Sequence, residues 1–168
     1  RDFMARNVEL PPAETRHAAM STCEGENVDG NEFYRRVDEA KLGFAYSGAF
    51  RCIERIVVSS DKSASWALIE SSTCESSVPA STVPFLFHPA MHDGCLQTTL
   101  ALADPSKGKR VPLEMIGLRV FATMPKSINV STRKRIDAVT GDESFSFKLY
   151  CTGTKLLIAE VEELRLAR

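Results

Sequence analysis

The fold of this chain is decided by residues 87–102, which read Phe87-His88-Pro89-Ala90-Met91-His92-Asp93-Gly94-Cys95-Leu96-Gln97-Thr98-Thr99-Leu100-Ala101-Leu102. Proline suits the first turn of a helix, where its missing N–H would have no intrahelical partner. The residues that follow are mostly apolar for nearly three turns, so we expect a core helix from Pro89 to Ala103. Asp104 ends it, because a residue before proline is pushed out of helical geometry.

Asp93 lies inside this apolar run. A carboxylate on the buried face of a helix costs free energy unless it is paired. Gln97 lies four residues further on the same face and can hold Asp93 by a hydrogen bond. The alternative is a partly exposed aspartate in the first helical turn, which the helix dipole favours. The residues alone leave both interpretations open.

The rest of the chain indicates an α+β domain whose strands are mostly antiparallel. Proline and glycine interrupt any periodicity in residues 1–31, which we interpret as a linker or lead-in with a possible helix cap at 28–31. A short amphipathic helix is expected over 32–42, ended by Gly43. The remaining expectations are a turn that runs into a strand over 44–58, a strand at 65–69 joined to it by a turn at 59–62, a loop at 71–82, and strands at 111–113, 116–123, 133–139, 144–152 and 156–166.

The composition excludes several classes of protein. The chain has 168 residues, 43% of them hydrophobic, and a net charge of −1. These values predict one soluble domain without a nucleic-acid footprint, and no stretch reaches the roughly 18 apolar residues of a membrane span. We find no signal peptide and expect a cytoplasmic protein. The five cysteines lack a Cys-x-x-Cys pair, and His88 and His92 lack a third ligand, so neither disulfides nor a metal site is expected.

The run from His88 to Gln97 resembles the His-Pro-x-x-x-Asp-x-x-x-Gln motif of the dehydratase domains of polyketide synthases and animal-type fatty acid synthases. The resemblance implies that Asp93 is the catalytic acid and that Gln97 supports it. It also implies that apolar surroundings keep Asp93 protonated, since burial disfavours the charged form of a carboxyl. His88 and Pro89 of the same motif are expected to contribute to substrate binding.

Two further segments match the same family. Residues 32–51 resemble its Tyr-x-x-Leu…Gly-x-x-Tyr-Gly-Pro-x-Phe segment, with Ser47-Gly48 in place of Gly-Pro, as in the fungal highly reducing branch. The resemblance places Tyr46 beside the substrate channel and Phe50 beneath the site. The alternative is that both are core aromatics, which the residues favour for Phe50. Residues 110–120 resemble the Leu-Pro-Phe-x-Trp-x-x-Val stretch without its Phe and Trp, and make Pro112 a lining residue at most.

The resemblance covers about residues 30–168 and implies a hot-dog fold, an antiparallel sheet wrapped around a central helix. Residues 32–168 would be the second of two fused hot-dogs, the C-terminal half of a dehydratase domain, with 1–31 leading in from the first. The family's base is a histidine in a His-x-x-x-Gly-x-x-x-x-Pro motif on the first hot-dog. None of His17, His88 and His92 has that context, so the base is expected on the missing half and this fragment alone should be inactive.

The function implied is elimination of water from a β-hydroxyacyl thioester to give an α,β-enoyl chain. The substrate would be carried on the phosphopantetheine of an acyl carrier protein, with no intrinsic cofactor. The other partners implied are the His-bearing half, the remaining synthase domains and a second copy in a homodimer. Two alternatives stay open: a product-template cyclisation domain, which usually carries histidine where Gln97 stands, and a non-catalytic hot-dog that serves as a scaffold or dimerisation module.

Overall fold

Strands in which buried and more exposed residues alternate build most of this protein, whose computed structural model describes residues 24–41, 43–71 and 87–167. In β3, for example, Ser65, Ala67 and Ile69 are buried while the residues between them are partly exposed. Such a pattern gives a sheet one buried and one wetter face. The strands are β1 (Gly25–Asp29), β2 (Ile53–Ser59), β3 (Ala64–Glu70), β4 (Val111–Ile116), β5 (Arg119–Val120), β6 (Ser127–Ile136), β7 (Glu143–Cys151) and β8 (Leu157–Ala167).

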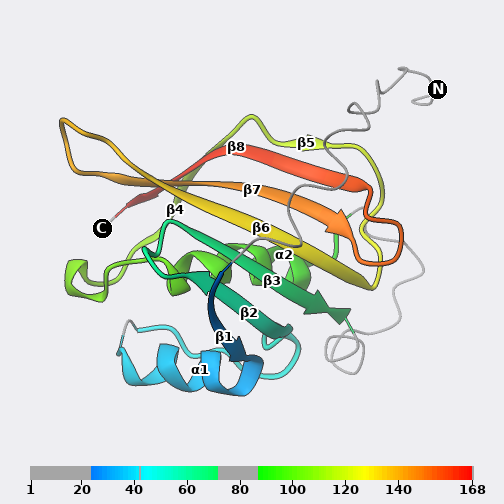
Figure 1. Ribbon diagram of the computed structural model, residues 1–168, viewed down its shortest axis with the longest axis horizontal. Helices are drawn as coiled ribbons and strands as arrows, with labels where there is room; N and C mark the ends of the chain where they lie inside the picture. The colour runs from blue at the N-terminus through cyan, green and yellow to red at the C-terminus, as the bar shows by residue number, and fades with distance from the viewer. Residues whose placement is uncertain (1–23, 42, 72–86, 168) are drawn as a thin grey trace.

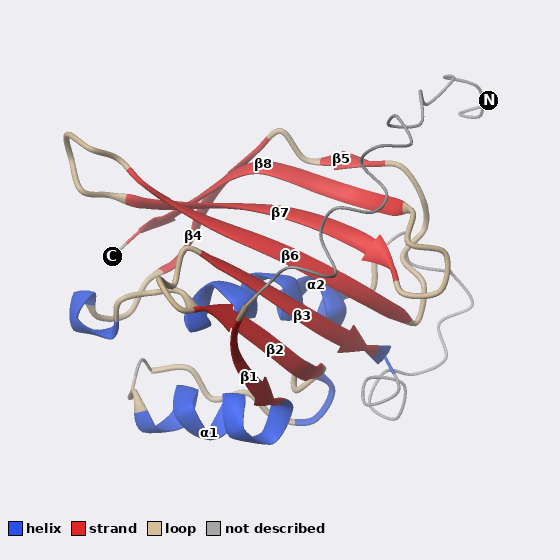
Figure 2. Cartoon of the chain, viewed as in Figure 1, coloured by secondary structure: helices blue, strands red, loops and turns tan. Residues whose placement is uncertain are grey.

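These strands form a single antiparallel sheet in the order β1-β2-β3-β6-β7-β8-β4, with β5 paired to β8 (Figure 1). The helix α2 (Pro89–Gln97) lies against one face of the sheet, and α1 (Gly30–Glu39) lies beside β1 and β2 (Figure 2). Three short 3-10 helices complete the described chain: η2 (Gly48–Phe50), η4 (Thr98–Ala101) and η5 (Pro105–Lys107). The expected antiparallel sheet packed on one apolar helix is confirmed.

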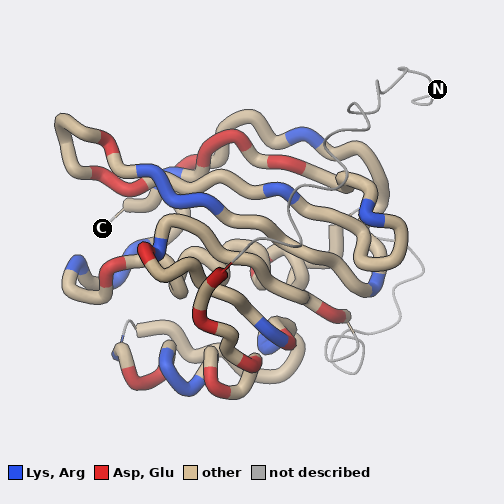
Figure 3. Tube along the Cα trace, viewed as in Figure 1, with Lys and Arg blue, Asp and Glu red and all other residues tan. Residues whose placement is uncertain are grey.

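The helix α1 begins at the cap that the sequence offers. Asp29 is the N-cap, and its Oδ1 accepts a hydrogen bond of 3.1 Å from the backbone N–H of Glu32. Glu32 in turn pairs with Arg35 and Arg36 one turn later, so acidic and basic residues alternate along the outer face of the helix (Figure 3). The helix runs from residue 30 to 39 instead of 32 to 42, because the chain already turns at Lys41, whose φ is 50°.

Residues 25–29 are a strand, β1, where the sequence predicted part of a lead-in. They pair along β2 from Gly25 opposite Ser59 to Asp29 opposite Arg55. Only Val28 in β1 is buried, so the strand carries almost no apolar signal of its own. Backbone pairing with β2 defines this strand. The two strands approach closely at Gly25, where a Cβ would lie 2.0 Å from the carbonyl oxygen of Val58. The preceding part of the predicted lead-in, residues 1–23, lies outside the described residues.

The core helix begins at Pro89 as expected but is α-helical only to Gln97. The next turn is the 3-10 helix η4, in place of the predicted continuation to Ala103. The hydroxyls of Thr98 and Thr99 donate to the carbonyl oxygens of Cys95 and Leu96, at 2.6 and 2.8 Å. Threonine hydroxyls that bond to preceding carbonyls compete with the helical ladder, which explains the tighter turn.

Three strand boundaries also differ from the expectation. The runs predicted at 111–113 and 116–123 are β4 and β5, separated at Gly117, which has a φ of 66°. The strand predicted at 133–139 is β6, which starts at Ser127 and ends at Ile136. Asp137 accepts hydrogen bonds from the backbone N–H groups of Val139 and Thr140, so these residues form a turn before β7. The hairpin of β2 and β3 is present as predicted, and most of the predicted loop at 71–82 lies outside the described residues.

Candidate active site

The site is built around the two polar residues of α2 that the sequence singles out. Gln97 is fully buried, and its Nε2 donates a hydrogen bond of 2.7 Å to Oδ2 of Asp93. The expected bond between residues one helical turn apart is therefore present. The prediction that apolar side chains enclose Asp93 is not met. Asp93 is half-buried and lines a cleft at the surface of the core.

The orientation of the Gln97 amide is determined by its other neighbours. Its Nε2 also donates to the carbonyl oxygen of Phe50 at 2.9 Å, while its Oε1 accepts from the hydroxyl of Tyr34 at 2.9 Å. A carbonyl oxygen can only accept, so the amide nitrogen must face Phe50. Both N–H groups and the oxygen of the amide are thus committed, and one N–H necessarily points at Asp93.

Tyr34 is the residue that sequence reasoning missed. It lies in the helix expected over 32–42, but no role in the site was expected for it. Its hydroxyl accepts a hydrogen bond of 3.1 Å from the backbone N–H of Ile53 and donates to Gln97. Burial raises the pKa of Tyr34, so the hydroxyl keeps its proton. The guanidinium of Arg51 lies 4.7 Å from the centre of the ring. The sequence contains a signal for this role, because the hydroxyl of a tyrosine on a buried helix face needs a hydrogen-bond partner.

Asp93 shares its cleft with two of the predicted substrate-binding residues. Tyr46 and Pro112 line the same cleft, which has a volume of about 90 Å³ and is bounded by Leu96 and Leu100 of the core. Pro112 comes from the edge strand β4, and Tyr46 from the segment before η2. The sheet therefore brings together three residues separated by up to 66 positions in the sequence.

The environment of Tyr46 keeps it a hydrogen-bond donor. Burial, which is the main cause, and the neighbouring Asp93 carboxyl raise the pKa of Tyr46 to about 12. Its ring stacks on Phe44, with ring centres 5.9 Å apart, and meets Tyr34 edge-on at 6.1 Å. A protonated phenol is thus held beside a carboxyl at the same cleft.

A second carboxyl borders the cleft but has a structural task. Asp104 caps η5, and its Oδ1 accepts a hydrogen bond of 2.9 Å from the backbone N–H of Ser106. This contact and the Ser106 hydroxyl hold the pKa of Asp104 below its ordinary value. Asp104 is therefore committed to capping η5 in its ionised form.

The other predicted site residues are placed differently. His88 is the N-cap of α2 and Pro89 its first residue, and neither is among the residues that line the cleft. The ring of Phe50 is 46% exposed, so the expectation that it packs beneath the site or in the core is wrong. It is the backbone of Phe50 that contributes, because its carbonyl oxygen holds Gln97.

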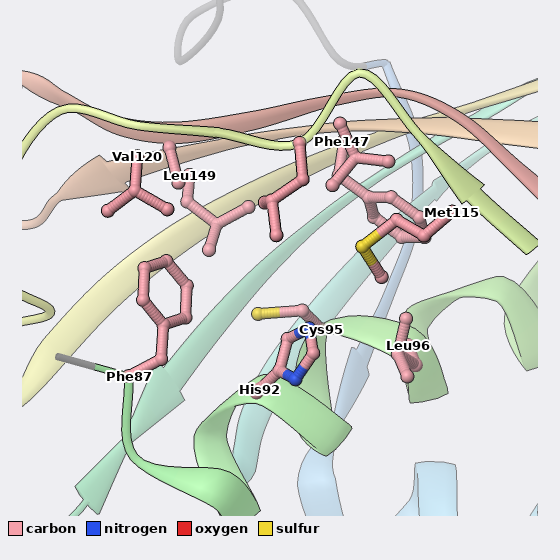
Figure 4. A pocket seen from close by; sticks show the side chains of 11 residues that line it. Phe87, His92, Cys95, Leu96, Met115, Val120, Phe147 and Leu149 are labelled. Atoms are coloured by element: carbon pink, nitrogen blue, oxygen red, sulfur yellow. The ribbon is translucent and has the colours of Figure 1, made fainter. Parts of the chain in front are cut away.

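An apolar cavity of about 240 Å³ lies on the other side of Leu96, between α2 and the sheet (Figure 4). Phe147 and Leu149 of β7 form its roof, and His92 and Cys95 of α2 point into it from below. Burial raises the pKa of the Cys95 thiol, which donates to the carbonyl oxygen of Met91 at 3.2 Å. Cys95 is therefore a neutral lining residue and not a nucleophile.

The described residues show no other chemical centre of the common kinds. Within residues 24–41, 43–71 and 87–167, no three His, Cys, Asp or Glu side chains are grouped so that they could hold a metal ion. Cys95 and Cys151 are free thiols. No helix in the described part of the chain has the length and apolarity to cross a bilayer. What the arrangement offers is a carboxyl, a phenol and an apolar cavity side by side.

Comparison with known proteins identifies a family for this architecture. The family model described as "Polyketide synthase dehydratase N-terminal domain" matches residues 12–168. The dehydratase domain of RzxB from Pseudomonas fluorescens superposes with a TM-score of 0.71 at 22% identity, over 89% of this chain and 52% of that one. GphF dehydratase 1 superposes with a TM-score of 0.69 at 21% identity, over 89% of this chain and 53% of that one.

The dehydratase domain from the CurJ module of the curacin polyketide synthase gives a TM-score of 0.64 at 18% identity, over 84% of this chain and 49% of that one. At these identities the superpositions establish the hot-dog fold. The chain spans about half the length of each of these solved domains. No curated protein sequence matches it significantly.

Proposed function

This chain belongs to the polyketide synthase dehydratase family, and we propose that it carries the acid side of a dehydratase centre, with Asp93 as the general acid. The observation that carries the proposal is the hydrogen bond of 2.7 Å from Gln97 Nε2 to Asp93 Oδ2. Because every polar atom of the Gln97 amide is committed, this contact holds one carboxyl oxygen inward. The other oxygen is left for a substrate in the cleft.

Loss of water from a β-hydroxyacyl thioester requires a base and an acid. The base removes the α proton, the electrons of that C–H bond form the new C=C bond, and the C–O bond at the β carbon breaks. Asp93 gives its proton to the departing hydroxyl, which leaves as water, and Asp93 becomes a carboxylate. The Gln97 N–H then stabilises that carboxylate, since a hydrogen bond to a charged acceptor is stronger than one to a neutral acceptor.

Tyr46 is proposed to bind the substrate from the opposite wall of the cleft. Its phenol keeps its proton at neutral pH because its pKa is about 12. It can therefore donate a hydrogen bond to the thioester carbonyl or to the β-hydroxyl. Pro112 is proposed to line the same cleft, while His88 and Pro89 contribute by starting α2 and so placing Asp93 one turn later.

The base is proposed to come from another hot-dog half, because no histidine of this chain lies in the family's base motif. The family description names an N-terminal domain, so our assignment of this chain to the second half rests on the Asp93 motif of α2. Exposed apolar residues adjoin the cleft: Phe50 beside Gln97, and Leu113, 69% exposed, beside Pro112. We propose that the His-bearing half covers them, in a homodimeric fungal-type synthase whose carrier protein presents the substrate on phosphopantetheine.

The test is turnover by the intact dehydratase that contains this chain, measured by mass spectrometry of a β-hydroxyacyl carrier protein. Asp93→Asn should abolish formation of the enoyl product while leaving the melting temperature nearly unchanged, because the amide fits the same space. The matched control is Asp104→Asn, which keeps a capping side chain and should retain turnover. Undiminished turnover by Asp93→Asn would exclude Asp93 as the acid, and an inactive intact protein would favour the scaffold alternative.

A further inference from the structure

The cavity between α2 and the sheet is apolar except at one place. Its walls are the aliphatic and aromatic side chains of four strands and of Phe87, which precedes α2. The imidazole of His92 is the exception, and it points into the cavity from the helix (Figure 4). Within residues 24–41, 43–71 and 87–167, the ring has a packing contact but no hydrogen-bond partner.

That packing contact fixes the direction of the imidazole. The ring of Phe87 meets it edge-on, with ring centres 5.9 Å apart and an angle of 84° between the planes. Burial lowers the pKa of His92, and the neighbouring Asp93 opposes this only in part. The imidazole is thus neutral at physiological pH and offers one N–H donor and one acceptor nitrogen.

A polar group facing an apolar space is costly unless something bonds to it. The neighbouring Cys95 of the same helix shows the contrast, because its S–H already donates to the carbonyl oxygen of Met91. The cavity is also large enough for a ligand: an apolar cavity of about 150 Å³ admits benzene, and this one measures about 240 Å³. It therefore accepts an acyl tail of more than about six carbons.

We propose that His92 is a specificity-determining residue that selects acyl chains carrying a hydroxyl or carbonyl oxygen in the part of the tail that fills this cavity. The proposal rests on the proposed function, because it makes the cavity the continuation of the cleft that contains Asp93. Leu96 lines both spaces, so the cleft and the cavity meet at this side chain. The oxygen that His92 recognises is therefore remote from the β-hydroxyl that Asp93 protonates.

The test uses binding of saturated thioesters, so that it does not depend on dehydration. Octanoyl pantetheine is compared by calorimetry with analogues that carry one hydroxyl or one keto oxygen on successive carbons of the tail, using the intact dehydratase that contains this chain. At the matching position the oxygenated tail should bind about two- to tenfold more tightly than the plain tail, the range expected for one added hydrogen bond. The hydroxyl and keto series show which oxygen is preferred.

Substitutions then assign the preference to the imidazole. His92→Leu should reverse it in favour of the plain octanoyl tail, and His92→Gln, which keeps a donor and an acceptor, should retain part of it. The control Met115→Leu, an apolar exchange on the sheet side of the same cavity, should leave the preference unchanged. The inference is overturned if no oxygenated tail is preferred, or if His92→Leu keeps the preference. If the protein prefers the oxygenated tail but forms no enoyl product, the proposed function is refuted and the role of His92 is not.

Discussion

Replacing Tyr34 by phenylalanine tests whether the first helix supports Asp93 and Gln97, the proposed catalytic pair. The substitution removes one hydroxyl and leaves two buried groups without their partner: the backbone N–H of Ile53 and the Oε1 atom of Gln97, which lie 3.1 and 2.9 Å from that hydroxyl. Tyr34 and Gln97 are only 3% and 1% exposed, so water cannot easily replace the lost bonds.

The expected magnitude follows from these two orphaned groups. A buried donor or acceptor left unsatisfied costs about 1–3 kcal/mol, and the two costs are not fully additive because they share one partner. We therefore expect Tyr34→Phe to lower the free energy of unfolding by about 2–4 kcal/mol. For a chain of this size that corresponds to a fall of about 5–15 °C in melting temperature. The freed amide of Gln97 can also rotate, so turnover should fall with stability.

The assay is thermal unfolding followed by circular dichroism, with Tyr150→Phe as the matched control. Tyr150 is also buried and packs against Trp66, with ring centres 5.8 Å apart and the ring planes tilted by 33°. Within the described residues its hydroxyl has no hydrogen-bond partner, so its loss should cost less than about 1 kcal/mol. If Tyr34→Phe destabilised the protein no more than Tyr150→Phe does, the hydrogen-bond network would not support Gln97 as argued.

Three further substitutions probe the core, a titratable group and a buried ion pair. A Cβ on Gly94 would lie 2.5 Å from Sγ of Cys52. Gly94→Ala should therefore lower the free energy of unfolding in urea by about 1–3 kcal/mol. The double mutant with Cys52→Ala should lose clearly less stability than the sum of the two single mutants. Burial lowers the pKa of His92 below its ordinary 6.5; the unfolded chain then binds the proton more readily, so stability falls as the pH drops below that value. His92→Leu should flatten that part of a plot of melting temperature against pH, and an unchanged slope would contradict the assignment. The Glu143 side chain, 2% exposed, forms ion pairs with Arg110 at 2.8 Å and with Lys107 at 3.1 Å. Glu143→Gln should therefore lower the free energy of unfolding by about 3 kcal/mol, which chemical denaturation would measure.

Contacts within one helical turn are what the sequence by itself determined. Asp93 and Gln97 are four residues apart, which places them on one face of any helix that contains both. Asp29 caps α1 for the same local reason, and the turn after Ser59 joins two alternating strands. In each case the partners are chain neighbours, so the backbone geometry alone brings them together.

The tertiary structure decided everything that depends on residues far apart in the sequence. Tyr34 and Gln97 are separated by 63 positions, and only the packing of α1 beside β2 brings the hydroxyl to the amide. The strand β1 has hardly any pattern and exists because β2 offers it unpaired backbone groups. Phe50 was expected for its ring but serves through its carbonyl oxygen. Sequence patterns report side-chain polarity, whereas backbone groups and long-range partners acquire their roles only when the sheet forms.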